Sequence, residues 1–242
     1  MRIAVVGAAG RMGGQVLNLM EQADYEPAVK IDSRGGDGVL TSLDQCDTKI
    51  DVIIDFSFHT AISSLLDYAV KNSVPTVLCT TGYTSEELEL IDNAAKTIPI
   101  FRSANMSLGA NALADLVRRA VSLFPNADVE IVETHHNNKA DAPSGTALML
   151  ADAVKDVRPD AVYVCGRNGM HKREPNEIGI HAIRRGGIVG THEVIITTGT
   201  QSITLTHEAY SRTIFAEGAL SAASFLVGKP AGMYSMVDLL KE

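Results

Sequence analysis

Residues 3–13 read Ile3-Ala4-Val5-Val6-Gly7-Ala8-Ala9-Gly10-Arg11-Met12-Gly13. The first four form a short apolar run that predicts a buried strand. Apolar residues at helical spacing after the glycines predict a helix; they are Val16, Leu17, Leu19 and Met20. Glycines allow a tight turn and a close approach of the backbone to a pyrophosphate, which the N-terminus of the helix can bind. The glycines at 7, 10 and 13 depart from the common Gly-x-Gly-x-x-Gly spacing, so the strand and helix on either side carry the prediction of a dinucleotide-binding unit.

Strands and helices continue to alternate through residue 102. Apolar runs predict strands at residues 26–31, 51–56, 75–78 and 99–102. Helical patterns occupy residues 60–71 and 86–96, and Thr84 with Glu87 forms a capping box before the second of these helices. This alternation is typical of a doubly wound parallel sheet, whose ligands bind beyond the carboxyl ends of the strands. The glycine turn, Asp32, Thr80-Thr81 and Ala104-Asn105 all follow predicted strands.

Asp32 lies where an acidic residue of such folds binds the ribose hydroxyls of the cofactor, although it could also be a turn residue. An acid at this point favours NAD over NADP because it repels a 2′-phosphate. Arg11 and Arg34 are nearby cations that could offset that repulsion. Both cofactors therefore remain possible.

Residues 133–147 hold the densest group of proton-carrying side chains, Glu-Thr-His-His-Asn-Asn-Lys-Ala-Asp-Ala-Pro-Ser-Gly-Thr-Ala. An alternating apolar run at 127–132 predicts a strand before them, and residues 146–154 predict a helix after them. The N-terminus of a helix attracts anions, and the adjacent histidines and lysine suggest a small substrate that carries carboxylates. The alternative is a surface His-His pair followed by an ordinary N-cap.

The second half of the chain has a different pattern, which predicts an α+β domain. A helix is expected at 109–123, a long mobile loop at 163–176, and three consecutive strands joined as hairpins at 178–185, 188–198 and 202–208. Helices at 215–227 and 236–240 could return to the first domain. A sheet covered by one or two helices leaves an open face, which suggests self-association.

Bulk composition is that of a soluble globular protein, with 45% hydrophobic and 21% charged residues. A net charge of −8 argues against nucleic acid as a partner. The three cysteines share no metal or redox spacing, Met1 leads directly into a strand, and no apolar run approaches the roughly 20 residues that span a bilayer. We expect a cytoplasmic protein that binds neither metal nor membrane.

Four segments resemble the dihydrodipicolinate reductase (4-hydroxy-tetrahydrodipicolinate reductase) family. They are residues 7–13, 80–82, 104–107 and above all 135–146, and the resemblance continues through 184–190 to the last helix. It implies an NADH- or NADPH-dependent oxidoreductase of lysine and diaminopimelate biosynthesis. It also implies a Rossmann-type domain at 1–106, completed by helices in 212–242, and a substrate-binding domain with a mixed open sheet at 107–211 that forms a homotetramer.

The resemblance also implies roles for individual residues. His135 matches the catalytic acid/base and Lys139 the proton donor, while His136, Ser144, Gly145 and Thr146 match positions that bind the substrate carboxylates. Cofactor positions are Gly7, Ala8, Ala9, Gly10, Arg11, Met12, Asp32, Cys79, Thr80, Thr81, Ser103, Ala104, Asn105 and Met106. Two residues depart from the family pattern. Cys79 stands where glycine is frequent, and Ser33 stands where some NADP-favouring members have arginine, which favours NADH slightly.

Two other functions share part of this pattern. An NAD-dependent amino-acid dehydrogenase would share the first hundred residues but has no need of residues 135–146. A nucleotide-sensing module would bind the cofactor without a cluster of proton-carrying groups.

Overall fold

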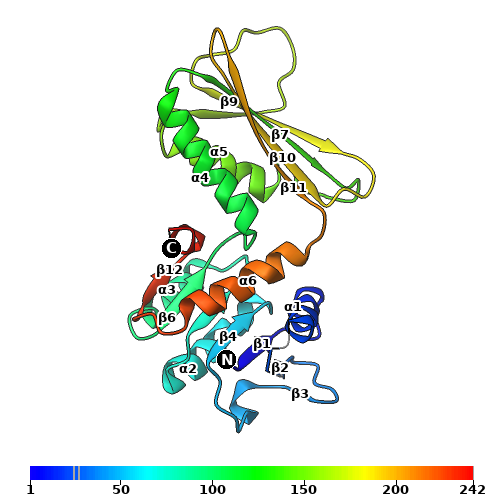
Figure 1. Ribbon diagram of the computed structural model, residues 1–242, viewed down its shortest axis with the longest axis vertical. Helices are drawn as coiled ribbons and strands as arrows, with labels where there is room; N and C mark the ends of the chain where they lie inside the picture. Colours follow the sequence, from blue (N-terminus) through cyan, green and yellow to red (C-terminus); the bar gives the residue numbers. More distant parts are fainter. Residues whose placement is uncertain (24, 27, 242) are drawn as a thin grey trace. The chain divides into compact units, whose positions relative to one another are not determined.

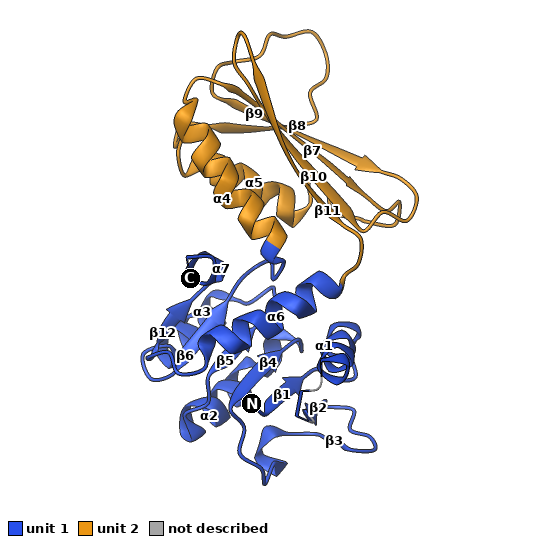
Figure 2. Ribbon diagram, in the orientation of Figure 1, with its two compact units in different colours: residues 1–108, 213–242 blue, residues 109–212 orange. Residues whose placement is uncertain are grey.

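The computed structural model describes residues 1–23, 25–26 and 28–241 (Figure 1). Contacts between Cα atoms divide the chain into two compact units (Figure 2). Unit 1 comprises Met1–Leu108 and Thr213–Glu242, and unit 2 comprises Gly109–Arg212. Within the described residues, the helices are too short or too polar to cross a membrane.

Unit 1 contains a seven-stranded parallel sheet in the order β12-β6-β5-β4-β1-β2-β3. Its strands are β1 (Ile3–Val6), β2 (Val29–Ile31), β3 (Val39–Leu40), β4 (Val52–Asp55), β5 (Thr76–Leu78), β6 (Pro99–Arg102) and β12 (Gly232–Tyr234). From β1, the strands β2 and β3 are added on one side and β4, β5 and β6 on the other, so the strand order reverses between β1 and β4. Ligands of doubly wound folds bind at this point. The predicted Rossmann-type sheet is confirmed.

Helices cover both faces of this sheet. One face packs against α1 (Arg11–Gln22), α6 (Thr213–Leu226) and α7 (Met236–Leu239), and the other against α2 (Ile62–Asn72) and α3 (Ser85–Ala94). The predicted capping box of Thr84 and Glu87 is present at the start of α3. A Cβ on Gly218 would overlap the carbonyl oxygen of Met106, so a glycine is needed for the close approach of α6 to the chain after β6. Short 3-10 helices, η1 (Leu43–Gln45) and η2 (His59–Ala61), complete the unit.

Unit 2 contains a mixed five-stranded sheet in the order β11-β10-β7-β9-β8. Its strands are β7 (Asp128–His135), β8 (Val162–Cys165), β9 (Glu177–Arg184), β10 (Gly190–Thr197) and β11 (Ser202–Ala209). Alternate residues of the three central strands are buried against α4 (Leu108–Leu123) and α5 (Gly145–Lys155), for example Ile131, Ile180 and Val194. Among the described residues of unit 2, no helix lies on the opposite face of this sheet (Figure 1). The predicted α+β domain with an open mixed sheet is confirmed.

The predicted run of consecutive hairpins is wrong in one respect. β10 and β11 form an antiparallel hairpin, but β9 and β10 are separated by β7, which is parallel to β9 and antiparallel to β10. Val129 and Ile131 of β7 are fully buried, and burial of these side chains is most complete when β7 is the middle strand of the sheet, with a neighbour on each side. The connection that contains Gly186 and Gly187 therefore crosses the C-terminal end of β7, where the N–H of Asn137 donates to the carbonyl oxygen of Gly186, instead of forming a tight hairpin turn.

Other element boundaries differ from the predicted ones. Strand β2 starts at Val29 rather than at residue 26, and Pro27 of the predicted range lies outside the described residues. Part of the predicted loop at 163–176 belongs to β8. In the remaining part, the guanidinium of Arg173 donates hydrogen bonds to the backbone oxygens of Val129 and Glu177. β7 extends to His135, so the first histidine of the pair ends a strand instead of lying in a connection.

Candidate functional site

A cavity of about 1140 Å³ lies in unit 1 at the carboxyl ends of β1, β2, β4 and β5. This exceeds the roughly 300–1,000 Å³ typical of drug-sized ligands, so it can hold an extended molecule such as a dinucleotide. Gly7 has a φ of +79°, and a Cβ at this residue would lie 2.5 Å from the carbonyl oxygen of Phe56. A Cβ on Gly13 would overlap the carbonyl oxygen of Gly7. Glycines are therefore required for the turn between β1 and α1, as the sequence predicts.

Most of the predicted cofactor residues line this cavity. They are Gly7, Gly10, Arg11, Met12, Asp32, Cys79, Thr80 and Thr81. Ala8 and Ala9 belong to the same turn but do not line the cavity, although the N–H of Ala9 donates to Asp32 over 3.0 Å. Ser103, Ala104, Asn105 and Met106 follow β6 and also lie outside the lining. There, the Ser103 hydroxyl donates to the carbonyl oxygen of Asn105 at 2.9 Å.

Asp32 is nearly buried at the end of β2, and its carboxylate pairs with Arg34. Nε of Arg34 lies 2.9 Å from Oδ1 of Asp32 and NH2 lies 3.3 Å from Oδ2, while the Arg34 side chain as a whole is largely exposed. The hydrogen bond from Arg34 lowers the pKa of Asp32 to about 2 and outweighs the opposing effect of burial. An ionised acceptor and a cation therefore stand together at this end of the cavity.

Asp55 is a buried carboxyl group that the sequence pattern identifies only as the end of a strand. Oδ2 accepts a hydrogen bond from the Thr80 hydroxyl at 2.8 Å, and Oδ1 accepts one from the N–H of Ser57 at 3.0 Å. Burial raises the pKa of Asp55, against the effect of the bonds from Ser57 and Thr80. Asp55 thus fixes the Thr80 side chain at the wall of the cavity.

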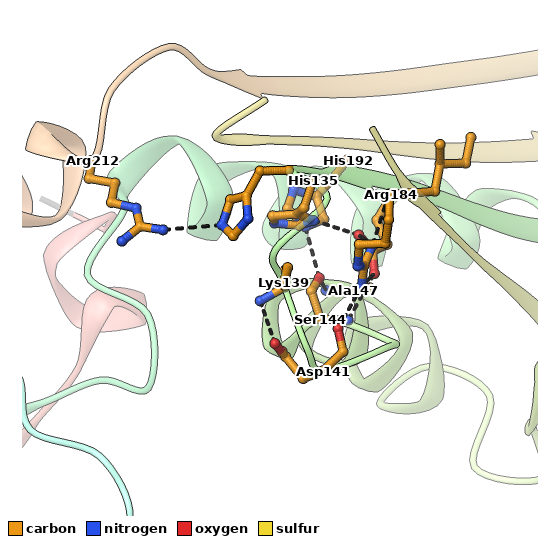
Figure 3. Close-up of polar contacts among 11 residues, drawn as sticks. His135, Lys139, Asp141, Ser144, Ala147, Arg184, His192 and Arg212 are labelled. Carbon is orange, nitrogen blue, oxygen red and sulfur yellow. Dashed lines mark hydrogen bonds and ion pairs between the residues drawn. The ribbon is translucent and has the colours of Figure 1, made fainter. Parts of the chain in front are cut away.

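The second group of functional side chains lies in unit 2, where pairing of three strands brings distant residues together. His135 on β7 is the register partner of Arg184 on β9, and Glu133 on β7 is the partner of His192 on β10. Residues 133 and 135 share one face of β7 because side chains alternate along a strand. That face also carries Ile131, which is buried against α4 and α5. The four polar side chains therefore lie on the face of the sheet that α5 covers, and Figure 3 shows His135, Arg184 and His192 beside the start of this helix.

The start of α5 is fixed to these strands by Ser144, which caps the helix. Its hydroxyl accepts from the N–H of Ala147 at 3.2 Å and lies 3.1 Å from Nε2 of His192. Its N–H donates to Oε1 of Glu133 at 3.0 Å. Burial lowers the pKa of His192 to about 4, so this imidazole is neutral near pH 7. Gly145 and Thr146 form the first turn of the helix.

Lys139 lies in the loop between β7 and α5 and pairs with a carboxylate of the same loop. Its Nζ is 2.8 Å from Oδ1 of Asp141, and this contact holds the pKa of Asp141 below its usual value. The preceding His136 accepts a hydrogen bond from Arg212 across 3.2 Å, from NH2 to Nε2 (Figure 3). The loop between β7 and α5 therefore carries the ammonium group of Lys139 and the imidazole of His136.

The predicted substrate-site residues of unit 2 thus lie together on β7, the following loop and the start of α5. Sequence reasoning missed Glu133 as a functional residue, and it also missed Arg184, His192 and Arg212. Glu133 had a local signal, since a carboxylate two residues before a histidine on a strand shares its face. His192 and Arg212 had none, because only the register of β10 and the end of β11 bring them near.

Comparison with known proteins gives matches over both halves of the chain. The sequence profile described as "Dihydrodipicolinate reductase, N-terminus" matches residues 1–106, and the one described as "Dihydrodipicolinate reductase, C-terminus" matches residues 109–240. A 4-hydroxy-tetrahydrodipicolinate reductase from Caldanaerobacter subterraneus subsp. tengcongensis is 47% identical, covering 100% of this chain and 99% of its own length. The same-named protein of Clostridium tetani is 44% identical over 99% of this chain and 97% of its own length.

Solved structures share the fold. A dipicolinate-bound dihydrodipicolinate reductase from Paenisporosarcina sp. TG-14 aligns with a TM-score of 0.82 over 98% of both chains, at 23% identity. A probable dehydrogenase from Thermotoga maritima aligns with a TM-score of 0.65 over 99% of this chain and 92% of its own, at 11% identity. At these identities the structures support the fold alone. On the two sequence profiles and the full-length relatives, the chain belongs to the dihydrodipicolinate reductase family.

Proposed function

We propose that this protein reduces 4-hydroxy-tetrahydrodipicolinate to tetrahydrodipicolinate with a reduced nicotinamide dinucleotide, in lysine and diaminopimelate biosynthesis. The observation that carries the proposal is the grouping of His135, His136 and Lys139 beside the N-terminus of α5. A dicarboxylate needs positive charge and N–H donors, and this grouping offers both. A dinucleotide-sized cavity in unit 1 agrees with an oxidoreductase.

The substrate carboxylates are assigned to the start of α5 and to the loop before it. Gly145 and Thr146 lie in the first turn of the helix, where backbone N–H groups and the helix dipole favour an anion. His136 and Lys139 supply the side-chain contacts, and Arg212 adds a further cation beside His136. Ser144 also remains a proposed substrate contact, but its hydroxyl and N–H already bond to His192 and Glu133, so its main contribution is to hold the helix start in place.

Lys139 is the proposed proton donor and His135 the assisting acid/base. Reduction requires that the 4-hydroxyl group leave as water, with a proton from the neighbouring ring carbon, which gives a C=C bond conjugated to the ring imine. A bound nicotinamide dinucleotide would supply a hydride to C4 of that bond, and the neighbouring ring carbon would then need a proton. Burial lowers the pKa of His135, against the effect of Glu133, so at neutral pH its imidazole is mainly uncharged. A neutral imidazole accepts protons better than it donates them, which favours Lys139 as the group that protonates the ring.

The cofactor is assigned to the cavity of unit 1, with the pyrophosphate at the glycine turn and the adenosine ribose at Asp32. Gly7 to Met12, Cys79, Thr80 and Thr81 complete this assignment, together with Ser103 to Met106 after β6. Ionised Asp32 favours the ribose hydroxyls of NADH, whereas the exposed guanidinium of Arg34 can compensate a 2′-phosphate. We therefore propose that both cofactors are used and that NADH is slightly preferred.

In the same proposal, unit 1 is the dinucleotide-binding domain and unit 2 binds the substrate and forms a homotetramer. The face of the unit 2 sheet opposite α4 and α5 carries partly exposed Ile183 on β9, Val132 on β7 and Ile195 on β10. Apolar groups on such a face favour burial against another subunit. All three cysteines are free, which agrees with a cytoplasmic protein.

An assay coupled to the preceding synthase tests the function. Freshly generated 4-hydroxy-tetrahydrodipicolinate should cause oxidation of NADH and of NADPH, each followed separately. Omitting the synthase gives the control. Equal rates with and without the synthase would contradict the proposal, and an amino-acid dehydrogenase would respond to its amino acid instead.

A further inference from the structure

Glu133 is a fully buried carboxylate that lies among four hydrogen-bond donors. Oε2 is 2.5 Å from Nδ1 of His135 and 2.8 Å from NH1 of Arg184. Oε1 is 3.0 Å from the N–H of Ser144 and 2.8 Å from NH2 of Arg184. The side chain is 0% exposed, so each of these contacts is made without competition from bulk water.

The surrounding donors keep this carboxylate ionised. Burial alone raises the pKa of Glu133, but the bonds from Arg184, His135 and Ser144 outweigh it and hold the pKa below its usual value. A buried charge of this kind is tolerated when it is paired and its lone pairs are satisfied. Arg184 supplies the pairing charge with the two parallel bonds that suit a carboxylate, and its NH2 group also bonds the carbonyl oxygen of Asp141 at 2.6 Å.

An ionised carboxylate can only accept hydrogen bonds, so Nδ1 of His135 must carry the proton in the bond to Glu133. The other ring nitrogen, Nε2, is then unprotonated when the imidazole is neutral. Nε2 faces Gly190, where an added Cβ would lie only 3.0 Å away. Glycine at this point of β10 thus leaves room beside the nitrogen that can exchange a proton.

We propose that Glu133 is a positioning residue that fixes the Nδ1–H tautomer of His135 and so leaves Nε2 as the ring nitrogen that exchanges a proton with the substrate. Through the N–H of Ser144, Glu133 also joins His135 to the start of α5. This inference rests on the proposed reductase function and deepens it. The carboxylate stabilises the imidazolium whenever Nε2 takes up a proton, in the manner of the acid in a Ser-His-Asp triad. One group therefore orients the proton-exchanging side chain and the anion-binding helix together.

Four charged or titratable groups surround His135: Glu133 on its own strand, Lys139 on the following loop, Arg184 on β9 and His192 on β10. Glu133 raises the pKa of His135, whereas Lys139 and Arg184 lower it. His192 contacts the His135 ring edge-on, with 5.1 Å between ring centroids. Without the charge of Glu133, the positive charges of Lys139 and Arg184 remain, and both disfavour the imidazolium form of His135. The pKa of His135 should therefore fall further.

Glu133→Gln makes a specific structural prediction. The Oε1 position faces two donors that cannot accept a hydrogen bond, the N–H of Ser144 and NH2 of Arg184. The Oε2 position faces NH1 of Arg184 and Nδ1 of His135, and of these only the imidazole can become an acceptor, so the glutamine oxygen should take the Oε1 position. Its NH2 group then faces His135, whose Nδ1 can bond to it only as an acceptor. The substitution should switch His135 to the Nε2–H tautomer, and Arg184 should lose the hydrogen bond from its NH1 group while it keeps the one from NH2.

The test uses protein labelled with 15N at histidine, and NMR correlations between ring nitrogens and ring protons report the tautomer. Comparison with His135→Gln assigns the His135 signals. We expect Nδ1–H in the wild type at neutral pH and Nε2–H in Glu133→Gln. Turnover should fall by at least about 10²-fold with a much smaller change in KM, because the tautomer and not substrate binding is altered. Glu133→Asp, which keeps the charge, should retain the wild-type tautomer and more of the turnover.

Glu130→Gln is the matched control. Glu130 also lies on β7 and pairs with a histidine and an arginine, since its Oε2 is 2.8 Å from Nε2 of His181 and its Oε1 is 3.4 Å from Nε of Arg173. It should leave the His135 tautomer and turnover unchanged. Nε2–H in the wild type, or an unchanged tautomer in a folded Glu133→Gln protein, would overturn the proposal. The tautomer is read without any substrate, so a protein with the expected switch but no reductase activity would refute the proposed function alone.

Discussion

Nζ of Lys139 lies 2.8 Å from Oδ1 of Asp141 in the loop between β7 and α5. The proposed proton donor is therefore held by a carboxylate of its own loop, and Asp141 itself is well exposed. A substrate carboxylate can replace Asp141 at the ammonium group without any rearrangement of the strands. The loop keeps its shape meanwhile, because Arg184 binds the carbonyl oxygen of Asp141 rather than its side chain.

His135→Gln and Lys139→Ala should each lower kcat by at least about 10²-fold, because each removes a positioned proton-exchanging group. Stability should change little. Glutamine can still donate to Glu133, and Lys139 lies in a loop with an exposed partner. Steady-state rates and thermal unfolding check both statements. His171→Gln and Lys172→Ala, in the exposed loop after β8, are matched controls that should behave as the wild type. Near-normal turnover in either site variant would refute its assignment.

Asp141→Asn should lower the KM for the dicarboxylate by up to about fivefold, because an exposed ion pair contributes up to about 1 kcal/mol and competes with the substrate for Lys139. The backbone bond from Arg184 to residue 141 remains in the variant. Initial rates over a range of substrate concentrations measure the effect, which should shrink as salt is added. An unchanged or higher KM would mean that Asp141 helps to bind the substrate rather than competing with it.

Arg34→Ala should weaken the binding of NADPH by roughly tenfold and leave the binding of NADH nearly unchanged, because the guanidinium can form a charge-assisted bond to a 2′-phosphate, which NADH lacks. The loss should be smaller at high salt. Cofactor Kd values from fluorescence titration check this. Lys30→Ala, an exposed cation on β2, is the control for a general change of charge. Equal losses for both cofactors would show that Arg34 acts mainly by orienting Asp32.

Unit 2 should lose stability as the pH falls from about 6.5 toward 4. Burial lowers the pKa of His192 from 6.5 to about 4, so in this window the unfolded chain binds a proton that the folded chain excludes. Stability from this group is fully present above pH 6.5 and declines by up to about 3 kcal/mol at the acidic end. Urea unfolding at several pH values should give a flatter pH dependence for His192→Gln than for the wild type. The exposed His171→Gln should retain the wild-type slope, and identical slopes for all three proteins would be inconsistent with a buried neutral His192.

Local sequence signals predicted the parts of the fold that depend on neighbouring residues. The turn at Gly7, the capping box at Thr84 and Glu87, and the helix after Ser144 each follow from a few adjacent side chains. The short strands β3 and β12 were missed, because two or three residues carry too little pattern. The prediction of a hairpin between β9 and β10 is wrong because β7 lies between them, and the order of strands depends on the whole sheet rather than on neighbouring residues.

The same distinction applies to the candidate site. The segment from His135 to Thr146 was recognisable as a unit, since its residues are contiguous. Arg184 is 51 residues from Glu133 along the chain, and only the parallel pairing of β7 with β9 brings the two together. A motif indicates which residues take part, whereas the register of the strands determines how the proton-carrying groups are connected.

Transfer of deuterium from cofactor to product tests the central claim most directly. NADH deuterated at its transferable position should be incubated with enzymatically generated 4-hydroxy-tetrahydrodipicolinate and the protein, and the product analysed by mass spectrometry. We predict tetrahydrodipicolinate that carries one deuterium on the ring, formed at a rate that His135→Gln and Lys139→Ala reduce strongly. A product without deuterium, or no reduced product at all, would contradict the account.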